Sequence, residues 1–305
     1  MKILYSVIKK PAQLIEVFSA VKYFKFDKVV CYVPEYWSIN ETKPIQIKYN
    51  NYIRSLNKND KDFVIDLKKY QIGESKIITN NLLKKKNLKC LALIGEDSIN
   101  RIKIFFGKKI LSIAVTDGSQ DSFSFLDYFI ICKSKKFLNY IKIPILFFLY
   151  NFFKLDFTFS NYPHHKYFYS NKTINNYNFD IDVKIKKILK KNKINTLILE
   201  DSTKTLEFKE IIKKYNLKKK NYCSIGRNGI FRIKNKAYKN ISLIPEVLIN
   251  SGIIKTIYTI PQSSVYTYGK SKKIKVIKLP MKIFNYPLCA SFFRSYISNR
   301  FLKIR

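Results

Sequence analysis

The chain has 305 residues, and its 58 Lys and Arg against 21 Asp and Glu give a formal net charge of +37. This length suggests about two domains, and 47% hydrophobic residues with only 8 Gly and 9 Pro exclude a disordered, collagen-like or linker-like chain. Only seven of the basic residues are Arg. Because nucleic-acid recognition favours the bidentate guanidinium group, we expect no nucleic-acid partner and attribute most of the charge to a lysine-rich, solvated surface.

The cysteines and histidines indicate a reduced, metal-free protein. The five cysteines form no C-x-x-C pair, and the two histidines are neighbours, His164 and His165, so no zinc or iron–sulfur spacing exists. The apolar run at the N-terminus is interrupted by Lys9 and Lys10 and is too short for a secretory signal. We therefore expect a cytoplasmic location, with the lysine-coated surface suited to the inner face of the cytoplasmic membrane.

Along the chain, apolar β-branched runs alternate with helical patterns, which predicts stacked βα units and parallel sheets. In the first half, the pattern predicts strands at 1–8, 28–33, 89–94 and 109–115, and helices at 11–23 and after residues 95–98. The most apolar stretch, 141–157, has an uncharged part shorter than the ~20 residues that a membrane span needs. A buried helix, an interfacial or dimer-forming aromatic helix, and a transmembrane span remain as its three interpretations.

A second βα series follows the aromatic, Asn-rich stretch 157–178. The pattern predicts helices at 182–191, 205–215, 244–251 and 291–304, and strands at 195–199, 222–225 and 254–260. Ser202 or Thr203 is the expected cap of the second of these helices, and Gly252 is expected to close the third. We therefore predict a domain at 1–178, a domain at 179–285 and a C-terminal helix within 286–305 that packs back on them.

The turn after the strand at 109–115 carries the first candidate site. In an open α/β sheet, groups at the carboxyl end of a strand face the ligand crevice. Asp117 lies there, followed by Gly118, which permits close backbone approach, and by Ser119, a hydroxyl donor. A carboxylate in this position can act as a general base on an acceptor hydroxyl. A simple Asp-Gly turn that ends the strand is the alternative.

The second candidate site lies in the second half. Ser263 and Ser264 follow the strand at 254–260, and paired hydroxyls with backbone N–H groups at a strand-to-helix turn can hold a phosphate. Glu246, next to Pro245 at a helix start, is the third polar group. A capped turn and a favourable helix-dipole charge are the corresponding structural alternatives. The chain has no G-x-S-x-G, G-x-G-x-x-G or P-loop motif.

Taken in order, these segments resemble the bacterial sialyltransferase-like glycosyltransferases of family 52 and the related polysialyltransferases. The resemblance lies in five short segments: 8–17, similar to the S-P-x-Q-L-x-N-A opening and including Gln13; 93–97, similar to a strand and Gly-acidic step; 116–119, similar to the D/E-D/E-G motif; 244–248, similar to I-P-x-E; and the Ser263-Ser264 pair.

The resemblance implies an α/β, GT-B-like fold in which two Rossmann-like domains, an acceptor-side domain and a nucleotide-sugar-binding domain, enclose a cleft. It implies inverting transfer of sialic acid from CMP-sialic acid to a cell-surface glycan, lipooligosaccharide or capsule. In that family the counterpart of Asp117 deprotonates the acceptor hydroxyl. The counterpart of Glu246 contacts the cytidine nucleotide, and the counterparts of Ser263 and Ser264 bind the phosphate. Gln13, Gly118 and Ser119 join the expected substrate-binding set, and no metal or other cofactor is implied.

Two departures from the family pattern leave alternatives open. Residues 222–227 hold no counterpart of the family's His-Pro motif, and Arg227 can supply positive charge there but no proton at neutral pH. Thr116 also replaces the first acidic residue of the D/E-D/E-G pair. A transferase with another nucleotide-sugar donor and a catalytically inactive glycan- or nucleotide-binding protein therefore remain as alternatives, and a homodimer remains open.

Overall fold

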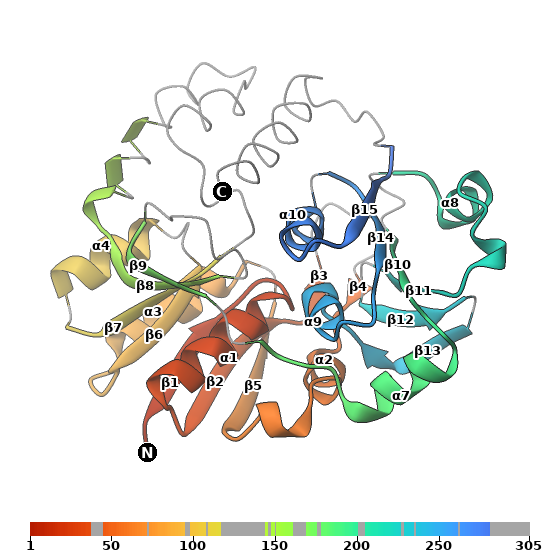
Figure 1. Cartoon of the computed structure of the whole chain (residues 1–305). Coiled ribbons are helices and arrows are strands. Elements are labelled where there is room, and N and C mark those ends of the chain that lie inside the picture. Colours follow the sequence, from red (N-terminus) through yellow and green to blue (C-terminus); the bar gives the residue numbers. More distant parts are fainter. Residues whose placement is uncertain are drawn as a thin grey trace. The chain divides into compact units, whose positions relative to one another are not determined.

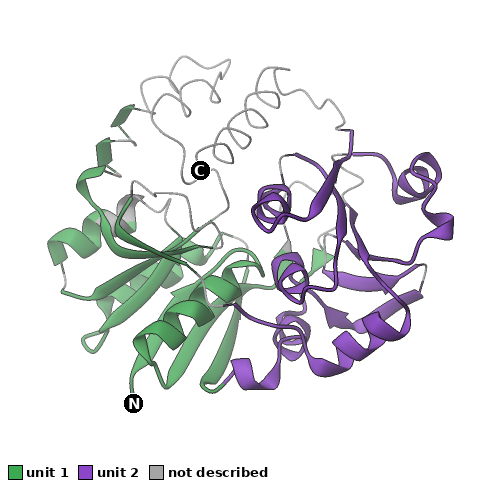
Figure 2. Cartoon of the chain, viewed as in Figure 1, with its two compact units in different colours: residues 1–47, 62–177 green, residues 48–61, 178–305 purple. Residues whose placement is uncertain are grey.

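The chain forms two compact units (Figure 2). The computed structural model describes residues 1–37, 45–71, 73–94, 98–107, 109–116, 144–145, 148–149, 151–160, 169–175, 178–200, 205–226, 229–234, 236–261 and 263–280. The first unit comprises Met1–Ile47 and Asp62–Tyr177, and the second comprises Lys48–Lys61 and Asn178–Arg305. Each unit contains its own β-sheet with helices, so the fold is α/β and compatible with a Rossmann-like architecture.

The first unit is built on a parallel sheet of seven strands (Figure 1). Its strands are β1 (Ile3–Val7), β2 (Lys28–Pro34), β5 (Val64–Tyr70), β6 (Cys90–Ile94), β7 (Leu111–Val115), β8 (Leu155–Ser160) and β9 (Ser170–Asn175). The spatial order is β5-β2-β1-β6-β7-β8-β9. The chain therefore builds outward from β1 in one direction and then from β6 in the other, which makes the β1/β6 gap a topological switch point.

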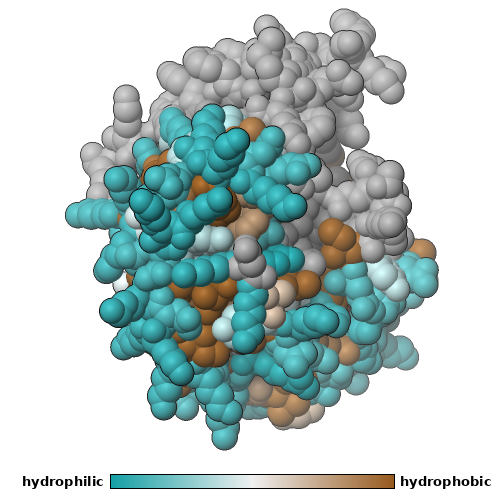
Figure 3. Space-filling model, turned by 90° about the vertical axis from the view of Figure 1, so that its right-hand side faces the viewer, coloured by the Kyte–Doolittle hydropathy of each residue, from teal (hydrophilic) through white to brown (hydrophobic). Residues whose placement is uncertain are grey.

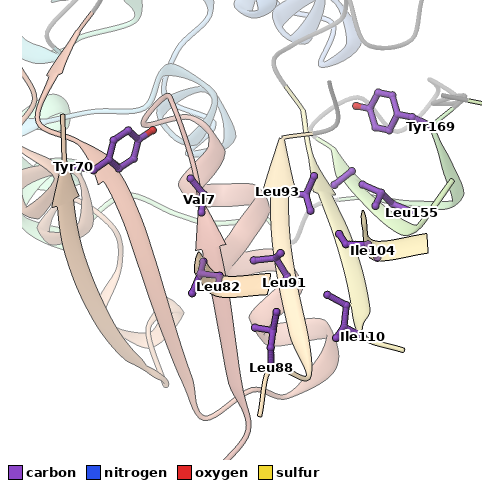
Figure 4. Packing of buried hydrophobic residues seen from close by; sticks show 11 residues of the cluster. Val7, Tyr70, Leu82, Leu88, Leu91, Leu93, Ile104, Ile110, Leu155 and Tyr169 are labelled. Atoms are coloured by element: carbon purple, nitrogen blue, oxygen red, sulfur yellow. The ribbon is translucent and has the colours of Figure 1, made fainter. Parts of the chain in front are cut away.

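Helices cover both faces of this sheet (Figure 1). They are α1 (Gln13–Phe24), α3 (Ser75–Lys84) and α4 (Ser98–Gly107), and a separate two-stranded sheet pairs β3 (Tyr36–Trp37) with β4 (Ile45–Gln46). On the face of α3 and α4, Leu82 and Ile104 pack with Val7, Leu91 and Leu93 from the strands (Figure 4). On the face of α1, the Phe24 ring contacts the rings of β8, so apolar side chains bury the sheet on both sides, as parallel strands require.

The second unit is built on a mixed sheet of six strands. Its strands are β10 (Thr196–Glu200), β11 (Tyr222–Gly226), β12 (Ile230–Ile233), β13 (Lys236–Ser242), β14 (Thr256–Thr259) and β15 (Lys275–Lys278). The order is β13-β12-β11-β10-β14-β15, and the switch point lies between β10 and β14. The expectation of parallel sheets throughout is wrong here, because β11, β12 and β13 form an antiparallel meander joined by short turns.

The helices of the second unit include one that the sequence pattern did not indicate. They are α2 (Tyr49–Arg54), α7 (Val183–Lys191), α8 (Phe208–Lys214), α9 (Pro245–Asn250) and α10 (Ser264–Ser271), with 3₁₀ turns at Lys58–Asp60 and Leu217–Lys219. The segment Lys48–Lys61, which carries α2, is held to the second unit by backbone bonds: the Asn57 N–H donates to the Asp180 carbonyl at 2.8 Å, and the Asp182 N–H donates to the Ser55 carbonyl at 2.8 Å.

Two predicted helix ends have different outcomes. Gly252 follows α9 with φ +73°, the left-handed conformation that closes a helix at low cost, as expected. The predicted Ser202 or Thr203 cap of α8 is wrong, because α8 begins at Phe208 and the Glu210 carboxylate accepts from the Glu207 N–H at 2.7 Å. The predicted C-terminal helix lies outside the described residues.

The described residues of the apolar stretch 141–157 do not form a buried helix, and Leu155 already begins β8. Its described residues between 144 and 152 are helical, and three of them, Ile145, Phe148 and Phe152, expose more than half of their surface. No helix among the described residues is long and apolar enough to cross a membrane. Elsewhere, lysines dominate exposed helix faces, as on α7, and the face drawn in Figure 3 is mainly hydrophilic with hydrophobic areas between.

The contact between Tyr52 of α2 and the turn before β12 yields a stability prediction. Gly229 has φ +72°, and a Cβ built there would lie 1.7 Å from the buried Tyr52 hydroxyl, whereas one built on Gly252, with φ +73°, would meet nothing within 4 Å. Both Gly→Ala changes cost about 1–2 kcal/mol through the backbone. Gly229→Ala should lose about 1–3 kcal/mol more through overpacking, measured by urea unfolding. Equal losses for Gly229→Ala and Gly252→Ala would contradict the packing.

Candidate functional site

Gln13 ties the turn after β1 to the end of β7. Its side-chain oxygen accepts hydrogen bonds from the backbone N–H groups of Lys9 and Lys10, at 2.7 and 3.0 Å. Its amide nitrogen donates to the backbone carbonyl of Thr116 at 3.0 Å. Gln13 is almost completely buried. A residue expected to bind substrate therefore holds, in this structure, the backbone immediately before Asp117.

Glu16, one helical turn later in α1, binds the same residue. The Thr116 N–H donates to Glu16 Oε2 at 2.5 Å, and the Thr116 hydroxyl donates to Glu16 Oε1. Together with Gln13, these bonds engage the N–H, the hydroxyl and the carbonyl of Thr116. Because β1 and β7 flank β6 in the sheet, the first turn of α1 fixes the carboxyl ends of strands on both sides of the switch point.

The predicted catalytic loop itself is not described. Asp117, Gly118 and Ser119 lie outside the described residues, and so does Arg227 in the second unit. The described part of the chain therefore fixes the position at which the Asp117 loop leaves the sheet.

In the second unit, the structure brings Glu246 and Ser264 together. Ser263 is the N-cap of α10, and its hydroxyl oxygen accepts from the Val265 N–H at 3.3 Å. The Ser264 hydroxyl, one residue later, donates to Glu246 Oε1 of α9 at 3.3 Å. Both serines follow β14 at the β10/β14 switch point, where a ligand crevice is expected in an open α/β sheet.

The carboxyl of Glu246 is buried and only partly hydrogen-bonded. Glu246 is 3% exposed, and its Oε2 atom is buried without a hydrogen-bond partner among the described residues. Burial raises the pKa of this carboxyl, although bonds from its own backbone N–H and from Ser264 act in the opposite direction. An unsatisfied buried oxygen costs stability and requires an explanation, and a ligand group that pairs with it is one.

A second side-chain bond holds α9 against α10. The Tyr268 hydroxyl of α10 donates to Asn250 Oδ1 of α9 at 2.6 Å. Burial, and secondarily the Glu246 charge, raises the pKa of Tyr268, so its hydroxyl keeps its proton and remains a donor near neutral pH. With one bond at each end of the helix pair, the Glu246 carboxyl has a fixed position relative to the N-terminus of α10.

A polar trio on the second sheet was missed by sequence analysis. Glu200, the last residue of β10, accepts from the Ser224 hydroxyl of β11 and from Arg232 Nη1 of β12, the latter at 3.0 Å. The available signal was an acidic residue that ends the apolar strand Thr196–Glu200. Glu16 carries a similar signal, since it is the one acid in the buried apolar helix α1.

The comparisons with known proteins add no identification. No protein-family model matches the chain, and no curated protein matches it. Among the residues that the structure describes, no group of three or more His, Cys, Asp or Glu side chains is placed to hold a metal ion. The site must therefore be interpreted from its own geometry.

The Glu246 carboxyl yields a pH prediction. Because the folded state raises its pKa, it binds the proton more tightly than the unfolded chain, and its effect on stability becomes less favourable as pH rises from the ordinary carboxyl pKa toward the raised one. Glu246→Gln, which cannot ionise, should gain stability relative to the wild type as pH rises from about 4 toward neutrality. Thermal unfolding across this range measures the difference. A constant difference at all pH values would contradict a raised pKa.

The Glu16–Thr116 contact yields a double-mutant prediction. Glu16→Ala leaves buried donors of Thr116 without an acceptor and should cost about 1–3 kcal/mol in urea unfolding. The loss in the double variant Glu16→Ala/Thr116→Val should be smaller than the sum of the two single losses, because they remove the same contact. Asp62→Ala, at a side chain that is 73% exposed, is the control and should change stability by less than about 0.5 kcal/mol. Strict additivity would contradict the coupling.

Proposed function

We propose that this chain is an inverting glycosyltransferase with a GT-B-like arrangement, in which the second unit binds a cytidine nucleotide sugar. Its donor would be CMP-sialic acid and its acceptor a cell-surface glycan such as lipooligosaccharide or capsule. The proposal joins the resemblance of the short motifs to the geometry of Glu246, Ser263 and Ser264.

The observation that carries the proposal is the unsatisfied Oε2 atom of Glu246 beside the N-terminus of α10. A nucleotide has groups that can bind both the N-terminus of α10 and the Glu246 carboxyl. Its phosphate can accept from serine hydroxyls and from the first-turn N–H groups of α10, where the helix dipole favours negative charge. A nucleoside hydroxyl or amino group can pair with the buried carboxyl, which relieves the cost of leaving that oxygen unpaired.

In the proposed reaction, Asp117 removes the proton from an acceptor hydroxyl as its oxygen attacks the anomeric carbon of the donor sugar. The new glycosidic bond forms while the bond from that carbon to the phosphate oxygen breaks, and CMP leaves with the bonding electrons. Ser263, Ser264 and Arg227 would stabilise the charge that develops on the phosphate. The bonds from Gln13 and Glu16 to Thr116 would hold the Asp117 loop in a fixed place at the sheet edge.

Residues 222–227 contain no histidine to match the His-Pro motif of the sialyltransferases. This absence favours a second candidate function, a transferase that uses another nucleotide sugar. Thermal unfolding with CMP, UDP and GDP separates the candidates, because a ligand that binds only the folded chain raises the melting temperature. The proposed donor predicts a shift with CMP alone. A shift with UDP or GDP alone would support the second candidate, and no shift with any of them would contradict both.

Activity measurements on Asp117→Asn test the catalytic proposal. The amide cannot accept the proton, so the rate of sugar transfer from CMP-sialic acid should fall by about 10²–10⁴-fold while CMP binding is retained. Asp62→Asn, at an exposed carboxylate, is the matched control and should keep the wild-type rate. If Asp117→Asn transfers sugar as fast as the wild type, Asp117 is not the base.

A further inference from the structure

Five phenylalanines from two distant segments of the first unit lie against one another. Phe105 and Phe106 lie in the last turn of α4, Phe148 and Phe152 belong to the helical residues before β8, and Phe153 follows them. Their ring centroids are 5.1 Å apart for Phe105 and Phe153, 6.0 Å for Phe105 and Phe152, and 5.8 Å for the stacked pair Phe148 and Phe152.

Four of these rings are more exposed than buried. The exposed fractions are 55% for Phe105, 74% for Phe106, 65% for Phe148 and 57% for Phe152. We call these four residues the phenylalanine patch. Phe153 is 9% exposed and lies beneath the patch, in ring contact with Phe106. Single exposed apolar residues need no explanation, but a contiguous aromatic surface is typical of an interaction site.

The charged residues within the segments that carry the patch are basic, although acidic residues border them. Residues 98–116 and 140–155 contain six Lys and Arg and no Asp or Glu. Among the described lysines of these segments, Lys103, Lys109 and Lys154 are exposed. The partner that suits this surface therefore presents negative charge together with an apolar layer.

Charge also decides between the two simplest occupants. A second copy of this chain would bring the same basic segments and a net charge of +37 to the contact, so electrostatic repulsion opposes self-association. An anionic lipid surface supplies the opposite charge at its headgroups and an apolar phase just beneath them. Aromatic side chains flanked by lysines favour this boundary region.

We propose that the phenylalanine patch docks the protein on an anionic lipid bilayer, with its rings in the boundary region and the neighbouring lysines at the headgroups. Within the first unit, the patch lies toward the amino edge of the sheet, since Gly107 precedes β7 and Phe153 precedes β8. Thr116 and the start of the Asp117 loop lie at the opposite, carboxyl edge. The bilayer contact therefore uses a different edge from the proposed catalytic loop, and it does not depend on the proposed reaction.

Vesicle co-sedimentation with the full chain tests the docking surface. The wild type should bind vesicles that contain about a quarter phosphatidylglycerol and bind pure phosphatidylcholine much more weakly. The triple variant Phe106→Ser/Phe148→Ser/Phe152→Ser should lose about tenfold or more of its partition coefficient on the anionic vesicles. The control is Val64→Ser/Ile77→Ser/Val183→Ser, which removes apolar side chains of similar exposure elsewhere and should bind like the wild type.

Two further measurements keep the proposal falsifiable. The chain has a single tryptophan, so Phe148→Trp in a Trp37→Phe background reports on the patch, and its emission should shift to the blue with anionic vesicles. Light scattering gives the oligomeric state of the wild type and of the triple variant. Unchanged vesicle binding by the triple variant, no emission shift, or a wild-type dimer that the triple variant converts to a monomer would each overturn the lipid proposal.

Discussion

In each unit, the first strand of the sheet, β1 or β10, pairs in parallel with a strand on each of its sides. This pairing decides where the polar groups of the unit lie. In the first sheet the chain builds outward from β1 and then from β6, and in the second from β10 and then from β14. In open α/β sheets, ligands bind at the carboxyl ends of the strands on either side of such a switch point. In the first unit Gln13 follows β1 and holds the backbone of Thr116, and in the second unit Ser263 and Ser264 follow β14.

Some of the local elements of this fold could be predicted from the sequence, but others, among them β5, β8, β9, β12, β13, β15 and the helices α2 and α3, were not, and neither was the strand pairing. Apolar runs with short turns indicated β1, β7, β10 and β14, because a buried parallel strand needs side chains of this kind on both faces. The sequence pattern predicted only the first strand of the β11–β13 meander and no strand at β12 or β13, so the antiparallel part of the second sheet was missed. The sequence analysis also did not predict that Lys48–Lys61 belongs to the second unit. Hydrogen bonds between backbone groups far apart in the sequence hold this segment there, and no local pattern indicates them.

For the site, the sequence indicated residue types at strand ends but not their hydrogen-bond partners. The order of the motifs predicted Gln13, Glu246, Ser263 and Ser264, yet the structure gives Gln13 a bond to the backbone before Asp117. The unpaired Oε2 atom of Glu246 follows from tertiary packing of α9 against α10, which no local pattern encodes. The lysine excess in the sequence likewise does not indicate a binding partner by itself. It supports a lipid contact only where lysines lie near exposed aromatic rings.

The proposed cytidine nucleotide site lies where β14 ends and α10 begins. A crystal structure of the chain with bound CMP tests it most directly. We expect phosphate oxygens within hydrogen-bond distance of the Ser263 and Ser264 hydroxyls and a nucleoside group paired with Glu246 Oε2. A nucleotide bound only at the carboxyl edge of the first sheet, with Glu246 Oε2 still unpaired, would contradict this expectation.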